Sequence, residues 1–383
     1  MKRRLLICLL LPLLLMGSAA QAQDFSFYRP PVFEWELFRR GEDTLTMVFV
    51  GDIMLHQKQI DNARALAGGK GFDFSRFFRL VEGRIAGADI AVGNLESPLT
   101  DPPYSGYPVF AAPDDYAEYL VRSGFDVLLL ANNHVLDKGR TGILHTIATL
   151  DRLEQEGSVR YTGIAADPQQ DTLRNPLMLR WKGICVALVN TTYGTNLGTD
   201  TAWPKVRRND RAETRAAIER ARRQGADVVI ALPHWGVEYQ LRHSPSQREF
   251  ARFLAESGAD IIIGSHPHVV QDMEVFETGG RRVPCYYSLG NAVSNMSATN
   301  TRIELMVQLK IARTSGGRVV LLPPEAEYLW CTLPGRLTDS YATLAVRDWL
   351  GRRSEWTEPA DYDNMLATYA RVQAATGIPD KKP

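Results

Sequence analysis

The sequence predicts a layered α/β fold with strands in the centre and helices outside. Four units begin with Gly-Ala-Asp or Gly-Phe-Asp, continue as an apolar run and end in polar residues, and they start at Gly87, Gly124, Gly225 and Gly258. The apolar runs are continuous rather than alternating, which is typical of strands covered on both faces. Segments with helix-type spacing precede three of these units, so strands and helices are expected to alternate. The units recur along the chain without forming a tandem repeat array.

The first strand is expected at residues 46–50, and it ends in Gly51-Asp52. Later strands are expected at residues 90–92, 127–130, 228–230 and 261–263. Helices are expected at residues 117–123, 211–224 and 246–257, each ending at a glycine. If these strands are parallel neighbours, their polar ends lie together at the sheet edge where open α/β sheets bind ligands.

The C-terminal third has a different pattern. Residues 283–288, 303–312 and 319–322 are apolar segments, and the alternation in residues 302–310 predicts an edge strand or a second sheet with one wet face. Residues 340–350 carry a helical pattern. We therefore expect an extended lead-in at residues 23–43, a main domain at 44–330, and a helical C-terminal extension at 331–383 whose end frays.

The N-terminus has the pattern of a secretory signal peptide. A basic segment with Lys2, Arg3 and Arg4 precedes an apolar stretch over residues 5–16 and the small-residue motif Ala20-Gln21-Ala22. Residues 1–22 are expected to be removed, which predicts an exported, periplasmic or extracellular protein. The apolar stretch is short for a membrane span, so no stable transmembrane segment is expected in the mature chain. An uncleaved segment that anchors the protein to the membrane is the alternative.

Composition excludes some classes of function. The 383 residues include 44 Lys and Arg and 44 Asp and Glu, so no overall basic field favours nucleic acid as a partner. The arginine-rich stretch 207–223 contains interleaved acidic residues and reads as a solvated helix face. Cys185, Cys285 and Cys331 lie in apolar contexts, so buried thiols rather than a disulfide framework are expected.

The most informative stretch is Gly264-Ser265-His266-Pro267-His268, directly after the strand expected at residues 261–263. Two histidines at i and i+2 in an extended segment project to the same side. Pro267 fixes its own φ and pushes His266 towards extended geometry. This arrangement is typical of a metal site, although a single histidine after a strand is more often a hydrogen-bonded loop residue.

Other strand ends supply further candidate ligands. They are Asp52, Asn94, Glu96, Asn133, His134 and His234. Carboxylate, amide and imidazole groups together suit one or two divalent transition metal ions such as Mn, Zn, Fe or Ni better than calcium. Alternatively, the carboxylates cap helices or strand ends, the asparagines occupy turns, and His134 is a proton donor. His56, His145 and His243 lack a strand-end position and are expected to be surface or helix histidines.

Six motifs in this order resemble the poly-gamma-glutamate capsule synthesis proteins of CapA type. The motifs are Gly51-Asp52-Ile53-Met54, Gly93-Asn94-Leu95-Glu96, Ala131-Asn132-Asn133-His134 with Asp137 and Gly139, His234-Trp235-Gly236-Val237-Glu238-Tyr239, Gly264-Ser265-His266-Pro267-His268, and Tyr287-Ser288-Leu289-Gly290-Asn291. The resemblance extends from about residue 47 to about residue 295. It implies a four-layer αββα sandwich of the calcineurin-like metallophosphoesterase type, with mixed sheets, outer helices and a metal site at the sheet edge.

The resemblance also implies roles for individual residues. Metal contacts are implied for Asp52, Glu96, Asn133, His234, His266 and His268, with Asp52 also part of the catalytic set and His134 in the place of the general acid. Asn94, Glu238, Asn291 and Arg140 are the candidate substrate-binding residues. Two positions depart from the phosphoesterase pattern, because Met54 replaces a histidine ligand and Asn94 replaces an aspartate.

Three functions follow as hypotheses. The resemblance implies a role in synthesis, export or processing of an extracytoplasmic anionic polymer such as poly-γ-glutamate, with the polymer synthesis or export machinery as a possible partner. The second hypothesis is a metal-dependent hydrolase of phosphoester or amide bonds in a cell-envelope polymer. The third is a non-catalytic module that holds a polymer end.

Overall fold

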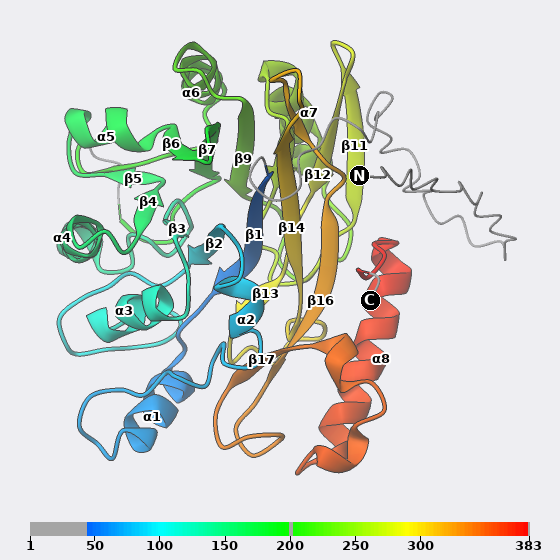
Figure 1. Ribbon diagram of the computed structural model, residues 1–383. Helices are drawn as coiled ribbons and strands as arrows, with labels where there is room; N and C mark the ends of the chain where they lie inside the picture. Colours follow the sequence, from blue (N-terminus) through cyan, green and yellow to red (C-terminus); the bar gives the residue numbers. More distant parts are fainter. Residues whose placement is uncertain (1–43, 199–201, 382–383) are drawn as a thin grey trace, which may run out of the picture.

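The computed structural model describes residues 44–198 and 202–381, and it places them in two β-sheets with helices on the outer faces (Figure 1). The expected signal peptide and lead-in, residues 1–43, lie outside the described residues. Within the described part of the chain, every helix is too short or too polar to cross a lipid bilayer.

The first sheet has nine strands, and its main path runs in the order β17-β16-β14-β1-β2-β3-β4. Strands β1 to β4 are parallel, and β14, β16 and β17 continue the sheet in antiparallel pairs. In addition, β13 pairs with β1 and β15 with β14. The strands are β1 Thr44–Ile53, β2 Ile90–Leu95, β3 Val127–Leu129, β4 Arg160–Thr162, β13 Asn291–Val293, β14 Ile303–Arg313, β15 Val319–Leu321, β16 Glu325–Thr332 and β17 Ala342–Ala345.

The second sheet has six strands in the order β11-β12-β10-β9-β7-β6. Its central strands β7, β9, β10 and β12 are parallel, and antiparallel strands lie at both edges. The strands are β6 Leu177–Trp181, β7 Ile184–Thr192, β9 Val228–His234, β10 Ile261–Ile263, β11 Met273–Thr278 and β12 Arg281–Tyr286, while β5 Ile164–Ala165 and β8 Lys205–Val206 form a separate pair.

Most helices lie on the two outer faces, and the last one contributes to the core between the sheets. They are α1 Gln57–Leu66, α2 Glu82–Ile85, α3 Asp114–Arg122, α4 Gly139–Gln155, α5 Pro168–Arg174, α6 Arg211–Arg223, α7 Pro245–Ser257 and α8 Pro359–Thr376, with short 3₁₀ helices at Val346–Trp349 and Arg353–Glu355. Side chains of α1 to α4 pack on the first sheet, and side chains of α6 and α7 pack on the second. The predicted four-layer αββα sandwich with mixed sheets is therefore confirmed.

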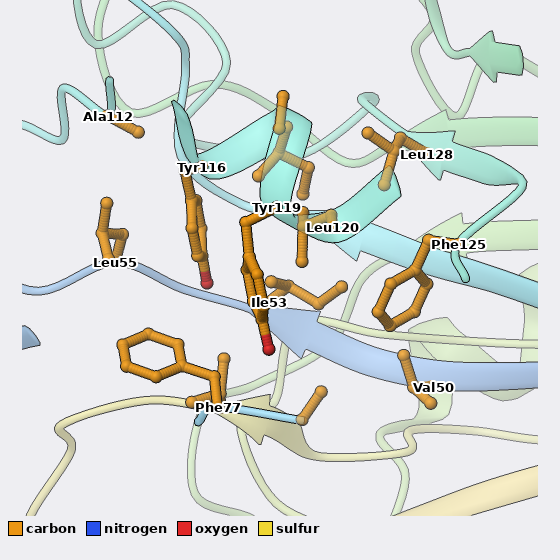
Figure 2. Close-up of a cluster of buried hydrophobic side chains, with 14 of the residues drawn as sticks. Val50, Ile53, Leu55, Phe77, Ala112, Tyr116, Tyr119, Leu120, Phe125 and Leu128 are labelled. Carbon is orange, nitrogen blue, oxygen red and sulfur yellow. The ribbon is translucent and has the colours of Figure 1, made fainter. Parts of the chain in front are cut away.

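Alternating side chains of the parallel strands fill different cores. In β1, Val48 and Val50 face the helices of the first sheet, whereas Met47 and Phe49 face the second sheet. Figure 2 shows the helix-facing core, which includes Tyr116 and Tyr119 of α3 and Val50 and Ile53 of β1. Both strand faces are buried, which explains why these strands are continuous apolar runs in the sequence.

The aspartate of each glycine unit aligns neighbouring parallel strands. Its backbone N–H and a carboxylate oxygen bond to the C=O and N–H of one residue on the adjacent strand. Asp126, for example, donates to Ala91 O over 2.9 Å and accepts from Ala91 N over 2.7 Å. Asp89, Asp227 and Asp260 form the same pair of bonds with Thr46, Cys185 and Val229. The repeated sequence unit therefore sets the position of a strand relative to its neighbour.

Two predictions about the C-terminal third are wrong. Strand β14 is neither an edge strand nor part of a separate sheet, because it lies inside the first sheet between β1 and β16 and is mostly buried. The predicted helix at residues 340–350 is instead β17 followed by a 3₁₀ turn. Pairing of β17 with residues 329–332 of β16 supplies hydrogen bonds that override the local helical pattern.

The last helix completes the fold. Helix α8 contributes Tyr362, Met365 and Val372 to the core between the sheets, and the Arg302–Asp361 ion pair ties it to the start of β14. Strand β16 runs through residue 330, the expected end of the main domain. Cys185, Cys285 and Cys331 are free and buried, which confirms that prediction.

Candidate metal centre

A group of buried polar side chains lies where strands of both sheets end. Asp52 and Glu96 come from β1 and from the residue after β2 in the first sheet, and Asn133 and His134 come from the loop after β3. His234 ends β9 of the second sheet, and His266 and His268 follow β10. All seven side chains are at most 3% exposed. The predicted gathering at one edge is confirmed, but two sheets rather than one supply the residues.

Asp52 is held by hydrogen bonds on both carboxylate oxygens. Its Oδ1 accepts from Asn94 Nδ2 at 2.7 Å, and its Oδ2 accepts from the His266 backbone N–H at 3.2 Å. His268 Nδ1 lies 3.3 Å from the same Oδ2. Burial acts to raise the pKa of Asp52, but the hydrogen bonds from His268 and Asn94 help to lower it to about 2. Asp52 is therefore an ionised carboxylate at neutral pH.

Glu96 is fully buried, and neither carboxylate oxygen has a hydrogen-bond partner among the described residues. Its Oε1 lies 3.5 Å from His234 Nε2 and 3.9 Å from His268 Nε2. Burial, followed by the nearby charge of Asp52, raises the pKa of Glu96 well above 4.5. Because unpartnered buried carboxylates are costly, this side chain needs a proton or a cation.

His234 connects the two sheets. Its Nε2 lies 2.8 Å from Asn133 Oδ1, and its Nδ1 lies 2.9 Å from Ser265 Oγ. Complete burial lowers the pKa of His234 well below 6.5. A neutral imidazole is the form that binds metal.

The turn containing His266 and His268 differs from the extended geometry expected from the sequence. Both residues have left-handed φ angles, +102° and +57°, which are uncommon for residues with a side chain. Hydrogen bonds hold the turn, since the His266 N–H donates to Asp52 and the Pro267 carbonyl accepts from Tyr239 N. The rings still project into one site, with centroids 5.8 Å apart. Unfavourable backbone angles that the surrounding structure holds in place are typical of functional sites.

Three overlapping groups of ligand atoms are close enough to hold a metal ion. They are Glu96, His234 and His266; Asp52, Glu96 and His268; and Glu238, His266 and His268. Within each group the atoms lie within 4.8 Å of one another. His266 Nδ1, like both Glu96 oxygens, is buried without a hydrogen-bond partner. Burial also lowers the pKa of His266 to about 3. These residues therefore fit a divalent transition metal ion.

His134 lies beside the ligand groups in an orientation suited to proton transfer. Its Nδ1 is 2.7 Å from Asp137 Oδ2, and that carboxylate also accepts from Phe110 N at 2.8 Å. The Phe110 ring packs edge-on against the imidazole at a centroid distance of 4.6 Å. Nε2 is 3.4 Å from Asn196 Nδ2. Asp137 fixes the ring in the manner of an orienting carboxylate.

The four candidate substrate-binding residues lie in different places. Asn94 and Asn291 are buried behind the ligands: Asn94 donates to Asp52, and Asn291 Oδ1 lies 2.9 Å from His268 Nδ1. Glu238 belongs to a ligand group. Arg140 is exposed, and its described contact is a hydrogen bond to the Trp203 carbonyl.

Two neighbours of the site were not predicted from the sequence. Tyr193, after β7, lies with its ring centroid 4.6 Å from that of His266. Glu304 of β14 is buried, and its Oε1 accepts from Gly51 N at 2.7 Å beside Asp52. Both residues follow or belong to apolar strands and carry no motif of their own. Their proximity to the site depends on strand order, which no local pattern shows.

Exposed aromatic rings surround the site. Tyr107, Tyr193 and Tyr239 are 71%, 49% and 43% exposed. Tyr107 packs near His134 with ring centroids 6.5 Å apart, and Tyr193 packs on His266. Such rings offer stacking and hydrogen-bonding surfaces beside the site.

The other histidines differ in their surroundings. His145 lies beside Asp114 on the surface of α4, and His243 stacks on Tyr287 at 4.0 Å, so both are outside the ligand groups as predicted. His56 is more buried than predicted. It precedes α1 and packs on Phe110, and burial lowers its pKa to about 4.

Comparison with known proteins gives one consistent family. The chain matches the family described as "Bacterial capsule synthesis protein PGA_cap" over residues 46–296. It is 30% identical over 298 residues to the capsule biosynthesis protein CapA of Bacillus anthracis, covering 74% of this chain and 68% of that protein. It is 29% identical over 292 residues to the PGA biosynthesis protein CapA of Bacillus subtilis, covering 74% and 72%.

Solved structures give weaker similarities. A calcineurin-like phosphoesterase from Bacillus subtilis aligns with a TM-score of 0.43 and 14% identity, covering 86% of this chain and 98% of that one. The NAD nucleotidase of Haemophilus influenzae aligns with a TM-score of 0.44 and 12% identity, covering 86% and 60%.

Proposed function

Because the chain belongs to the bacterial capsule synthesis protein PGA_cap family, we propose that it processes an anionic cell-envelope polymer such as poly-γ-glutamate by metal-dependent hydrolysis. The relatives in the two Bacillus species are named for capsule and PGA biosynthesis. Synthesis or export without hydrolysis is the alternative role. The proposed location is outside the cytoplasm, either periplasmic or extracellular, or held at the membrane by an uncleaved N-terminal segment.

The state of Glu96 is the observation that carries the metal-dependent part of the proposal. This carboxylate is completely buried, has no hydrogen-bond partner on either oxygen within the described residues, and belongs to two of the three ligand groups. A role as a ligand of one or two divalent ions would explain both features. A purely structural carboxylate is expected to have hydrogen-bond donors instead.

The proposed ligands are Asp52, Glu96, His234, His266 and His268, with Asn133 Oδ1 adjacent to His234 and Glu238 at the outer side. Mixed carboxylate and imidazole ligands suit Mn, Zn or Fe, as one or two ions. When bound, such an ion supplies Lewis-acid polarisation of the bond to be cleaved and lowers the pKa of the attacking water.

The chain's own residues position the remaining chemistry. Asp137 accepts from Nδ1–H of His134, so Nε2 is the nitrogen from which the protonated ring would deliver a proton to the leaving group. Asn94 and Asn291 hold Asp52 and His268, so the ligand atoms are fixed before substrate binds. Met54, which is buried, stands where the phosphoesterase pattern has a histidine ligand. Amide bonds of the polymer are therefore to be tested together with phosphoesters.

The test combines metal analysis with an activity screen on the purified mature chain. We expect bound transition metal and metal-dependent cleavage of γ-glutamyl oligomers or of phosphoesters. Replacement of His266 and His268 by Ala should remove both metal and activity. The matched control replaces His145 and His243, which lie outside the ligand groups, and should retain both. Absence of metal after supplementation, or activity that survives the first replacement, contradicts the proposal.

A non-catalytic binding role is the second candidate. The exposed rings of Tyr107, Tyr193 and Tyr239 beside the site favour it, because they can hold a polymer chain whether or not a bond is cleaved. Metal-loaded protein that binds γ-glutamyl oligomers without cleaving any tested bond would support this role over hydrolysis.

A further inference from the structure

We propose that a second site, separate from the metal centre, binds carboxylate groups of an anionic polymer chain. The site is a cavity of about 470 Å³ whose walls include Lys58 of α1, residues 295–300 after β13, and Arg371 of α8. The identity of the polymer rests on the proposed function, whereas the preference for anions follows from the cavity itself.

The lining of the cavity has one sign of charge. Its charged side chains are Lys58, Arg302 and Arg371, and no Asp or Glu occurs among its lining residues. The other polar side chains, including Asn295, Asn300 and Thr368, are neutral amides or hydroxyls. A concave surface with cations and neutral donors favours an anionic ligand.

Two of the three cations are not neutralised by a carboxylate. Arg302 is paired with Asp361 through two 2.6 Å hydrogen bonds. Arg371, in contrast, donates to the amide oxygen of Asn300 at 2.9 and 2.8 Å and to the Thr368 hydroxyl. Lys58 is exposed and has no hydrogen-bond or ion-pair partner within residues 44–198 and 202–381. Positive charge is therefore available to a ligand from both sides of the cavity.

The metal centre needs such a site if it acts on a polyanion. The ligand groups contain three acidic side chains, those of Asp52, Glu96 and Glu238. One or two divalent ions would offset the negative charge of these side chains only close to the ions. Polymer carboxylates that lie farther from those ions are not attracted by them, because interactions between exposed charges are screened within about 10 Å. Cations outside the centre can attract these carboxylates and hold the chain.

A residue that lines the cavity, Met296, contacts Asn291, and Asn291 in turn contacts the proposed ligand His268. Asn291 Nδ2 donates to the Thr301 carbonyl at 3.0 Å and contacts Met296 Sδ, while Asn291 Oδ1 contacts His268. Asn295 N lies 3.3 Å from His56 Nδ1. The segment that lines the cavity therefore contacts Asn291, the residue that supports the proposed ligand His268.

Binding of a fluorescently labelled γ-linked glutamate decamer to the full mature chain tests the proposal. Lys58→Ala/Arg371→Ala should weaken binding of the decamer roughly tenfold at low salt. Added salt should reduce the difference in affinity between this variant and the wild type. The control Lys70→Ala/Arg79→Ala removes two exposed charges elsewhere and should bind like the wild type. Equal affinity of the cavity variant and the wild type, or an equal loss in the control, overturns the proposal.

Two further binding experiments distinguish this site from the metal centre and from a site for small anions. His266→Ala/His268→Ala should still bind the decamer and should still lose affinity when combined with the cavity changes, which distinguishes this site from the proposed catalytic function. Inorganic phosphate should compete only weakly on a molar basis, because it occupies one cation position at a time. Competition by phosphate at the concentration of the decamer itself would identify a small-anion site and overturn the polymer assignment.

Discussion

At the level of a single residue, replacement of Glu96 should change how strongly metal stabilises the protein. Replacement by Gln keeps the shape of the side chain but removes the charge that a cation requires. Wild-type protein should gain about 2.7 kcal/mol of unfolding free energy at a metal concentration 100 times Kd, and Glu96→Gln should gain almost none. Thermal or urea unfolding with and without metal measures this difference. The surface control Glu249→Gln should behave like the wild type, and a full metal effect in Glu96→Gln would contradict the ligand assignment.

The buried carboxyl group of Glu304 should make the free energy of unfolding depend on pH. Burial raises its pKa well above the ordinary value of 4.5, and the hydrogen bond from Gly51 N only partly offsets this. A raised folded-state pKa means that the folded protein binds the proton more tightly than the unfolded chain. The stabilisation is therefore fully present below pH 4.5 and is lost as pH rises through the folded-state pKa.

Glu304→Gln removes this titration while keeping an oxygen that can accept from Gly51 N. Its stability should match that of the wild type near pH 4 and exceed it increasingly as pH rises. Urea unfolding of both proteins across this range gives the comparison. A constant difference at all pH values would show that Glu304 does not titrate in this way.

The sequence predicts individual site residues where a motif follows a strand. Asp52, Glu96, Asn133, His234, His266 and His268 all meet that condition, and all lie at one edge. Tyr193 and Glu304 do not, because they reach the site through strand order and loop path. The left-handed turn at His266 was not predicted either, since its backbone is held by a hydrogen bond that the His266 N–H donates to the distant residue Asp52.

At the level of elements, the aspartate that precedes a parallel strand should contribute measurably to stability. Asp126→Ala removes the acceptor for Ala91 N and leaves a strand N–H without its partner. We expect a loss of about 1–3 kcal/mol in the free energy of unfolding. Asp126→Asn keeps an acceptor oxygen and should recover much of that loss. Equal stability of the Ala and Asn variants in urea unfolding would show that the side-chain bond is unimportant.

Local patterns predict elements well only when the local signal agrees with the final pairing. Strand β10 and helix α7 were predicted to within one residue, because continuous apolar residues and a terminal glycine mark them. Residues 340–350 have a helical pattern, yet pairing with β16 makes Ala342–Ala345 a strand. The wet-face alternation of β14 was misleading because Glu304 is buried against Gly51 rather than exposed.

At the level of the whole molecule, the metal centre joins two sheets that otherwise meet mainly through apolar side chains. Asp52 and Glu96 belong to the first sheet, whereas His234, His266 and His268 belong to the second. A bound ion would therefore cross-link the sheets at one edge. In the absence of an ion, burial and then the nearby charge of Asp52 raise the pKa of Glu96, which disfavours its ionised form.

Removal of metal by a chelator should loosen this edge while leaving the core between the sheets intact. Hydrogen exchange should become faster at residues 264–269 and 193–198, which form the turn and the loop over the centre, and should change little in β1 and β9. His266→Ala/His268→Ala should show the fast pattern with or without chelator, because it cannot hold the ion. Unchanged exchange in wild-type protein after confirmed metal removal would show that the hydrogen bonds of the turn, rather than an ion, hold the two sheets together at this edge.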